Sequence, residues 1–94
     1  MRLREDLKAM QTRAEEVLAD VSDETSLDAW RTAYLGKKGE LTGILRSLGS
    51  LPIDERPTMG RLANKVKEAL QEAYEHRAEM VRQEALKEAL QREA

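Results

Sequence analysis

Residues 49–57 read GSLPIDERP, and this stretch decides how the 94-residue chain can fold. It combines a glycine with two prolines, residues that interrupt regular helices, and it forms the clearest turn signal in the chain. We expect the chain to reverse direction near Leu51 and Pro52. A new helix should follow, with Asp54 as its N-cap and Pro57 as its third residue, because the first helical turn needs no N–H from proline.

Before the turn, apolar residues are spaced as in helices. From Leu3 to Val21 the steps between them alternate between four and three residues, which predicts a helix over residues 3–20. A second stripe over residues 41–48 predicts a short helix that Gly49 ends.

Another helix is expected between these two. Thr25 and Asp28 fit a capping box, so this helix should begin near Ser26. Gly36 is placed to end it in the left-handed conformation, which glycine adopts without steric cost.

After the turn, nothing in the sequence interrupts a helix that runs to Ala94. The chain contains no alternating pattern of the kind that predicts strands. The predicted fold is therefore all-α, a long antiparallel helical hairpin or coiled coil without a sheet, forming one domain over residues 1–94. Its first arm, residues 3–48, is broken into short helices and folds back along the second arm, residues 54–94.

The hairpin predicts which residues face one another. Large residues meet small ones in this register, which suits helix packing. Paired glycines would allow the two backbones to approach closely. The expected pairs are Leu41 with Leu62, Trp30 with Ala73, Val17 with Leu86, and Gly43 with Gly60.

Charge is distributed unevenly along a chain whose net charge is -2. Residues 37–67 hold seven basic and three acidic side chains, whereas both flanking segments are acidic. In the hairpin these residues would form the distal end and the termini the base, so the rod would have a positive tip. Such a tip suits a polyanion. The candidate residues for binding such a polyanion are Lys37, Lys38, Arg46, Arg56, Arg61 and Lys65.

Composition excludes several classes of protein. The chain has no cysteine and only one histidine, so we expect no metal site, no catalytic pair and no cofactor bound by this chain. No stretch is apolar enough to span a membrane, and a reducing, cytoplasmic location is the expectation.

Trp30 and Tyr34 are interpreted as seam residues rather than as a platform for bases. For Lys37 and Lys38, a plain solvated loop remains the alternative interpretation.

The central part of the chain resembles a known family. YLGKKGELTGILRSLGSLPIDERPTMGRLANKVKEAL, residues 34–70, is similar to the N-terminal region of the bacterial phenylalanyl-tRNA synthetase alpha chain. Three motifs carry the resemblance, and it covers nearly the whole chain. They are Arg31 with residues 34–42, Leu48 with residues 51–56, and Gly60 with Asn64 and Lys67.

The resemblance implies a role in protein biosynthesis. It implies a coiled-coil arm that reaches the outer corner of tRNA and positions it, attached to the catalytic domain of a class II aminoacyl-tRNA ligase. It also implies that the parent enzyme is an (αβ)2 heterotetramer with a beta subunit, and that it uses ATP and Mg to attach phenylalanine to its tRNA. The ATP-binding motifs would lie beyond residue 94, so this chain alone is not expected to be an enzyme.

Two functions are compatible with the sequence. The first is a tRNA-binding arm that grips phosphates through the basic tip. The alternative is a coiled coil for protein–protein interaction without a nucleic-acid role. Seam residues near the base also fit a homodimer of this domain.

Overall fold

The protein is an elongated helical rod of 62 × 19 × 16 Å. The computed structural model describes residues 2–93, and the side chains of residues 3–92. The elements are α1 (Arg2–Ala19), α2 (Glu24–Leu35), α3 (Glu40–Ser47), a 3₁₀ turn η1 (Leu48–Ser50) and α4 (Arg56–Glu93). None of the described residues forms a strand. The prediction of an all-α hairpin with a broken first arm is confirmed.

The reversal of the chain occurs at residues 51–55, as predicted. Glu55 donates its backbone N–H to the carbonyl of Pro52 at 3.0 Å, and its own carbonyl accepts from Met59 at 3.1 Å. α4 therefore begins at Arg56, so Pro57 is its second residue and Asp54 lies outside the helix. Pro57 still falls in the first turn, where its missing N–H leaves no gap in the helical bonds.

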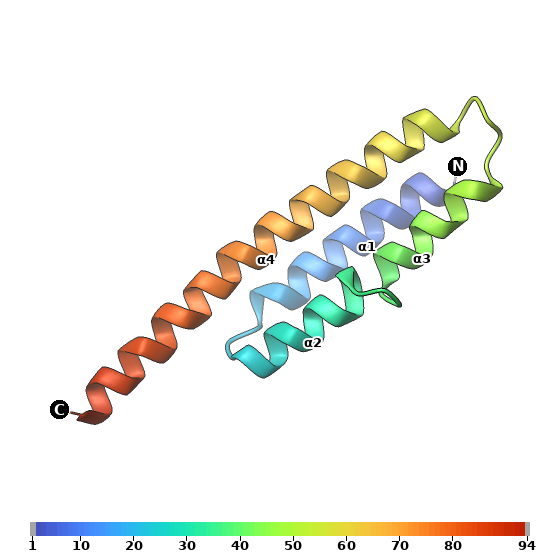
Figure 1. Cartoon of the computed structure of the whole chain (residues 1–94). Coiled ribbons are helices and arrows are strands. Elements are labelled where there is room, and N and C mark those ends of the chain that lie inside the picture. The colour runs from blue at the N-terminus through green and yellow to red at the C-terminus, as the bar shows by residue number, and fades with distance from the viewer. Residues whose placement is uncertain (1, 94) are drawn as a thin grey trace.

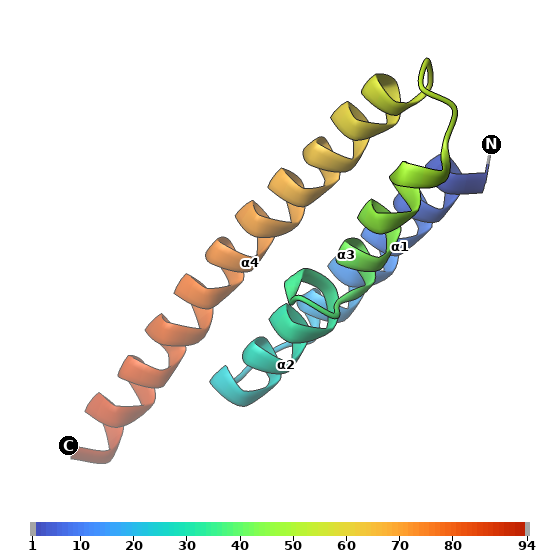
Figure 2. The same ribbon diagram turned by 45° about the vertical axis from the view of Figure 1, so that its right-hand side comes forward.

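α2 and α3 return along α4, and α1 adds a third layer that the sequence did not predict. Figures 1 and 2 show α1 starting beside the end of α3 and running in the same direction as α4. Arg13 on α1 pairs with Glu40 at the start of α3 at 3.0 Å, and the two helices run antiparallel. α1 therefore begins at the same end of the rod as the turn of residues 51–55. The sequence had led us to expect the termini at the opposite end.

The C-terminal end of α1 is held by an arginine from α4. Arg77 donates from Nε to the carbonyl of Val21 at 2.8 Å and from Nη2 to that of Ala19 at 2.7 Å. These bonds satisfy carbonyls that a helix end leaves without a partner. The expected pairing of Val17 with Leu86 is wrong, because these side chains are 48% and 56% exposed.

The core runs along the line where α1, α2, α3 and α4 meet. Trp30 is its centre, since its side chain is 2% exposed and Nε1 donates to the carbonyl of Ala14 at 2.7 Å. Its ring stacks on Tyr74 with centroids 6.0 Å apart, which places Trp30 within one residue of the expected partner Ala73. Trp30 is therefore a seam residue, as predicted. The other buried residues are Leu7, Met10, Ala14, Leu18, Val21, Leu27, Leu41, Met59, Ala63, Val66, Leu70 and Val81.

α2 begins two residues earlier than predicted, because Asp23 is its cap. Oδ1 of Asp23 accepts the backbone N–H of Ser26 at 2.7 Å. That backbone hydrogen bond, together with one from the Ser26 side chain, lowers the pKa of Asp23 below its ordinary value of 3.8. The predicted capping box of Thr25 and Asp28 is wrong, since both residues lie inside α2.

The predicted close approach of Gly43 and Gly60 is also wrong. A Cβ atom built on either glycine has no neighbour within 4 Å, so the two backbones do not crowd each other.

In α4, residues 82–92 are all exposed, and Figures 1 and 2 show this end running beyond α1 and α2.

Candidate nucleic-acid interface

The loop between α2 and α3 holds Lys37 and Lys38 on a fixed support. Gly39 donates its N–H to the carbonyl of Gly36 at 2.9 Å, and the Thr42 hydroxyl donates to the same carbonyl at 2.8 Å. Both lysine side chains are exposed between these bonds. The loop is therefore closed by its own hydrogen bonds, and the ammonium groups project from a defined backbone.

The two glycines of this loop are needed for close contact rather than for a left-handed conformation. Gly36 has φ -71° and ψ 172°, an extended conformation, so the predicted left-handed end of α2 is wrong. A Cβ atom on Gly36 would lie 2.7 Å from the carbonyl oxygen of Thr32, and one on Gly39 would lie 2.9 Å from that of Tyr34. Any larger residue would push the loop away from α2.

The loop lies part-way along the rod and not at its end. Figure 1 shows the α2–α3 connection beside the middle of α4, whereas the turn of residues 51–55 forms the end. The expectation that residues 37–67 together form a distal tip is therefore wrong. Lys37 and Lys38 lie on the side of the rod.

A third lysine, Lys67 on α4, lies level with this loop. Trp30 and Tyr74 stack on each other, and Lys37 follows Trp30 by seven residues just as Lys67 precedes Tyr74 by seven. Because α2 and α4 run in opposite directions, these equal steps from the stacked pair bring Lys37 and Lys67 to about the same position along the rod. Tyr74 also lines the groove between α2 and α4 together with Ala78. Steps of four and three residues place Lys67 on that same side of α4.

Lys65 lies on the other side of α4, although only one residue separates it from Lys67. Two residues along an α-helix correspond to a rotation of about 200°. Lys65 is exposed one helical turn after Arg61, so both side chains project from the outward surface of α4. Lys65 therefore does not belong with Lys37, Lys38 and Lys67.

Arg56 and Arg46 have different surroundings. The guanidinium of Arg56 donates from Nε to the carbonyl of Leu51 and from Nη2 to that of Gly49, both at 2.9 Å. Through these two hydrogen bonds Arg56 connects the start of α4 to the turn. Arg46 is exposed on α3 and points away from Leu41 and Leu45, which pack toward the core.

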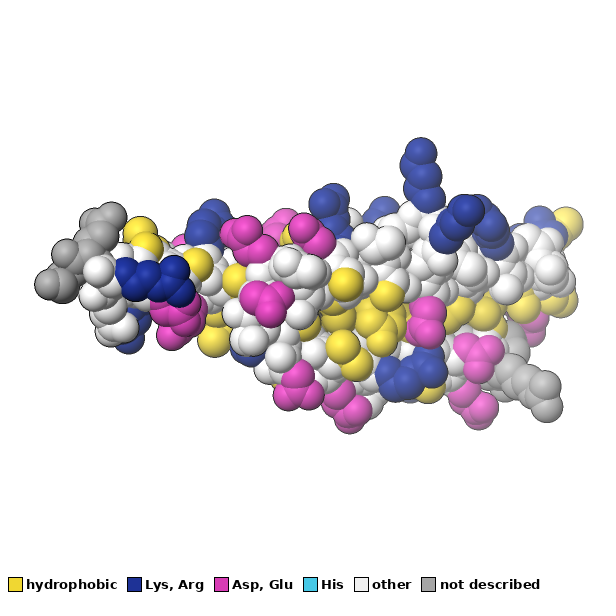
Figure 3. Space-filling model, turned by 90° about the horizontal axis from the view of Figure 1, so that it is seen from below, with side chains coloured by type: hydrophobic (Ala, Val, Ile, Leu, Met, Phe, Trp, Pro, Cys, Tyr) yellow, Lys and Arg dark blue, Asp and Glu magenta, His cyan; other side chains and the backbone are white. Residues whose placement is uncertain are grey.

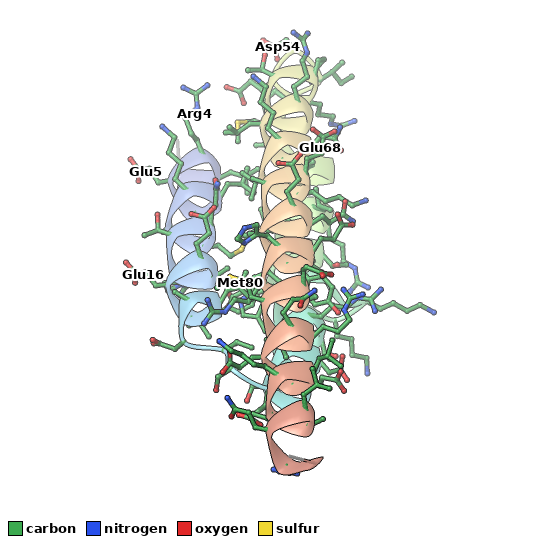
Figure 4. All side chains as sticks on the ribbon, turned by 90° about the vertical axis from the view of Figure 1, so that its left-hand side faces the viewer. Arg4, Glu5, Glu16, Asp54, Glu68 and Met80 are labelled. Carbon is green, nitrogen blue, oxygen red and sulfur yellow. The ribbon has the colours of Figure 1, made fainter. Side chains whose placement is uncertain are left out.

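Charge divides between the two sides of the rod rather than between its ends. Figure 3 shows Lys and Arg side chains along one edge of the half toward the turn, and mostly Asp and Glu side chains along the opposite edge. Figure 4 shows Glu5 and Glu16 on the outer side of α1. Among the described residues, the ion pairs are Arg13–Glu40 and Arg82–Glu79. The lysines beside the α2–α3 loop therefore have no ion-pair partner within the described part of the chain.

Arg31 also belongs to the basic side, although it is not among the site residues predicted from the sequence. Its guanidinium carbon lies over the Tyr74 ring, 5.7 Å from the centroid, and its side chain is exposed. A signal was present in the sequence, because Arg31 lies one helical turn before the end of α2 on the same side as Leu27 and Leu35. We call Arg31, Lys37, Lys38 and Lys67 the lateral basic face.

Neither a metal site nor a membrane-spanning helix is present in residues 2–93. No group of three or more His, Asp or Glu side chains there could hold a metal ion. No helix in this range is long and apolar enough to cross a membrane.

Comparison with known proteins connects this geometry with a family. The family described as "Aminoacyl tRNA synthetase class II, N-terminal domain" matches residues 22–90. The chain belongs to this family. The match begins just before α2, so it includes the whole lateral basic face and leaves α1 outside.

The curated relatives are phenylalanine–tRNA ligase alpha subunits. The chain is 41% identical over 92 residues to the subunit from Persephonella marina, covering 98% of this chain and 27% of the relative. It is 54% identical over 74 residues to the one from Moorella thermoacetica, covering 74% of this chain and 22% of the relative. The chain thus corresponds to the N-terminal coiled-coil domain of such subunits and spans about a quarter of their length.

Proposed function

We propose that this domain is the tRNA-binding arm of a cytoplasmic phenylalanine–tRNA ligase alpha subunit, and that it positions tRNA without taking part in catalysis. The parent protein would assemble with a beta subunit as an (αβ)2 heterotetramer and would use ATP and Mg in a separate catalytic domain. Membership of the N-terminal domain family supports this proposal.

The lateral basic face is the single observation that carries the RNA-binding part of the proposal. Its lysines are exposed, have no ion-pair partner among the described residues, and lie on one side of the rod. Ammonium groups on a fixed surface release counterions when they meet phosphates, which gives affinity without reading sequence. Such contacts suit a folded RNA that is recognised by its shape.

The other predicted site residues would contribute to the RNA contact to different extents. Arg46 and Arg61 would extend the contact toward the turn, because both are exposed in that half of the rod. Arg56 would contribute charge while it holds the turn. Lys65 would contribute least, because it lies on the opposite side of α4 from Lys67.

A salt titration of tRNA binding tests the proposal. We expect log affinity to fall linearly with log salt concentration, with a slope of about -0.7 to -0.9 for each phosphate contacted. The triple variant Lys37→Ala, Lys38→Ala, Lys67→Ala should reduce the magnitude of that slope by about 2 to 3.

The matched control is Lys87→Ala, which removes the same kind of charge near the free end of α4. This variant should leave the slope unchanged, because Lys87 lies far from the lateral basic face. An unchanged slope in the triple variant would exclude these lysines from the contact. A wild-type chain that does not bind tRNA at any salt concentration would contradict the proposed function itself.

A protein-interaction surface is the second candidate function. Leu86 and Leu90 lie one turn apart on the free end of α4 and are 56% and 60% exposed. Large apolar side chains at this spacing are typical of a helix that packs against another protein. Replacing both by Gln should leave tRNA binding unchanged if the two surfaces act separately.

A further inference from the structure

The ring of Tyr74 is a fixed platform beside the lateral basic face. It stacks on Trp30 with an interplanar angle of 12°, and Trp30 is anchored by its bond to the carbonyl of Ala14. Tyr74 itself is only partly buried, so part of it remains at the surface. Its position is therefore set by the core while its outer edge faces solvent.

Arg31 lies on this platform. Its guanidinium carbon is 5.7 Å from the Tyr74 centroid, a cation–π distance, and no carboxylate among the described residues pairs with it. A guanidinium is planar and weakly hydrated, so it can stack on an aromatic ring through one face and on a second ring through the other. The side chain is exposed, which leaves room for that second ring.

The surroundings of Arg31 favour an uncharged partner over a phosphate. Glu24 and Asp28 line the groove next to Tyr74, and Arg82 in the same groove is paired with Glu79. These carboxylates repel phosphate from this end of the basic face, whereas they do not repel a neutral ring. Lys67 lies two helical turns away from Tyr74, about 10 Å along α4, and outside this groove.

We infer that Arg31 and Tyr74 form a stacking site for one unstacked base of an RNA loop, while Lys37, Lys38 and Lys67 hold the adjoining phosphates. RNA bases that are splayed out of a loop stack on aromatic rings and on arginine planes. This inference rests on the proposed function and sharpens it: the arm would bind a looped region of RNA rather than a continuous duplex.

Two RNAs and two variants of the 94-residue chain test the inference. The first RNA is a hairpin with an unpaired loop, and the second is the fully paired duplex of the same stem. Arg31→Lys keeps the charge and removes the plane, so it should weaken hairpin binding by about 5- to 100-fold, the range for one stacked base. It should leave duplex binding unchanged.

The matched variant is Lys67→Ala, which removes a phosphate contact and should weaken hairpin and duplex binding alike. If Arg31→Lys binds the hairpin as tightly as the wild type does, the stacking site is refuted while the proposed function stands. If Arg31→Lys weakens both RNAs equally, Arg31 contacts a phosphate and the inference is again refuted. If the wild type binds neither RNA, the stacking site is refuted, and the tRNA titration decides the proposed function separately.

Discussion

Lys65 and Lys67 belong to the same run of basic residues, but they lie on opposite sides of α4. Lys67 is on the side where α2 and α3 pack, beside Lys37 and Lys38 at the same height of the rod. Lys65 projects from the outward surface of α4, one helical turn after Arg61. Because two residues correspond to a rotation of about 200°, Lys65 and Lys67 carry the same charge in different surroundings.

This comparison shows why a basic stretch of sequence is not a basic surface. Residues 37–67 span a loop, a helix, a turn and part of another helix, so their side chains are distributed around and along the rod. What gathers Lys37, Lys38 and Lys67 is antiparallel packing, which the Trp30–Tyr74 stack fixes. Each of the following measurements alters one side of the rod and leaves the other as a reference.

Gly39→Ala should have the largest effect on the side of the lateral basic face. The added Cβ would lie 2.8 Å from the carbonyl carbon of Tyr34, so the loop must shift. We expect the free energy of unfolding to fall by about 1–3 kcal/mol, as for other overpacked sites. Chemical denaturation would measure the loss, and tRNA affinity should fall with it because Lys37 and Lys38 move.

Gly43→Ala is the control for this prediction. Its Cβ has no neighbour within 4 Å, so the variant should gain about 1 kcal/mol of stability from helix propensity alone. If the two alanine variants had equal stability, the account of the α2–α3 loop as a close-packed support would be contradicted.

The cap of α2 should give a smaller, pH-dependent effect. The hydrogen bond from Ser26 lowers the pKa of Asp23 in the folded state, so ionised Asp23 stabilises the fold above its ordinary pKa of 3.8. This contribution is lost as pH falls through the lowered pKa. Thermal melts of wild type and Asp23→Ser should therefore differ most at neutral pH and converge in acid. A difference that does not change with pH would mean that the charge of Asp23 has no part in the cap.

The secondary structure of the chain was predictable because local signals specify it. Alternating steps of four and three residues located α1, and the prolines at positions 52 and 57 located the turn and the start of α4. The direction of α1 was not predictable in this way. An apolar stripe establishes that a helix is amphipathic, but it does not say which neighbour covers the stripe or in which direction that neighbour runs.

The candidate site was predictable only in part. Exposure of Lys37 and Lys38 followed from the glycines around them, whereas the grouping with Lys67 and Arg31 depends on tertiary packing. Arg77 offered a missed signal, because it interrupts the apolar seam between Ala73 and Val81. An arginine at a seam position indicates bonds to carbonyls, which is its role at the end of α1.

Charge reversal at the two neighbouring lysines tests the central claim most directly. Lys67→Glu and Lys65→Glu have the same composition and net charge, so only the side of α4 differs between them. We expect Lys67→Glu to weaken tRNA binding by about tenfold or more relative to Lys65→Glu, a difference of at least ~1.4 kcal/mol. Equal affinities for the two variants, or weaker binding by Lys65→Glu, would contradict a lateral basic face formed by α2, α3 and α4.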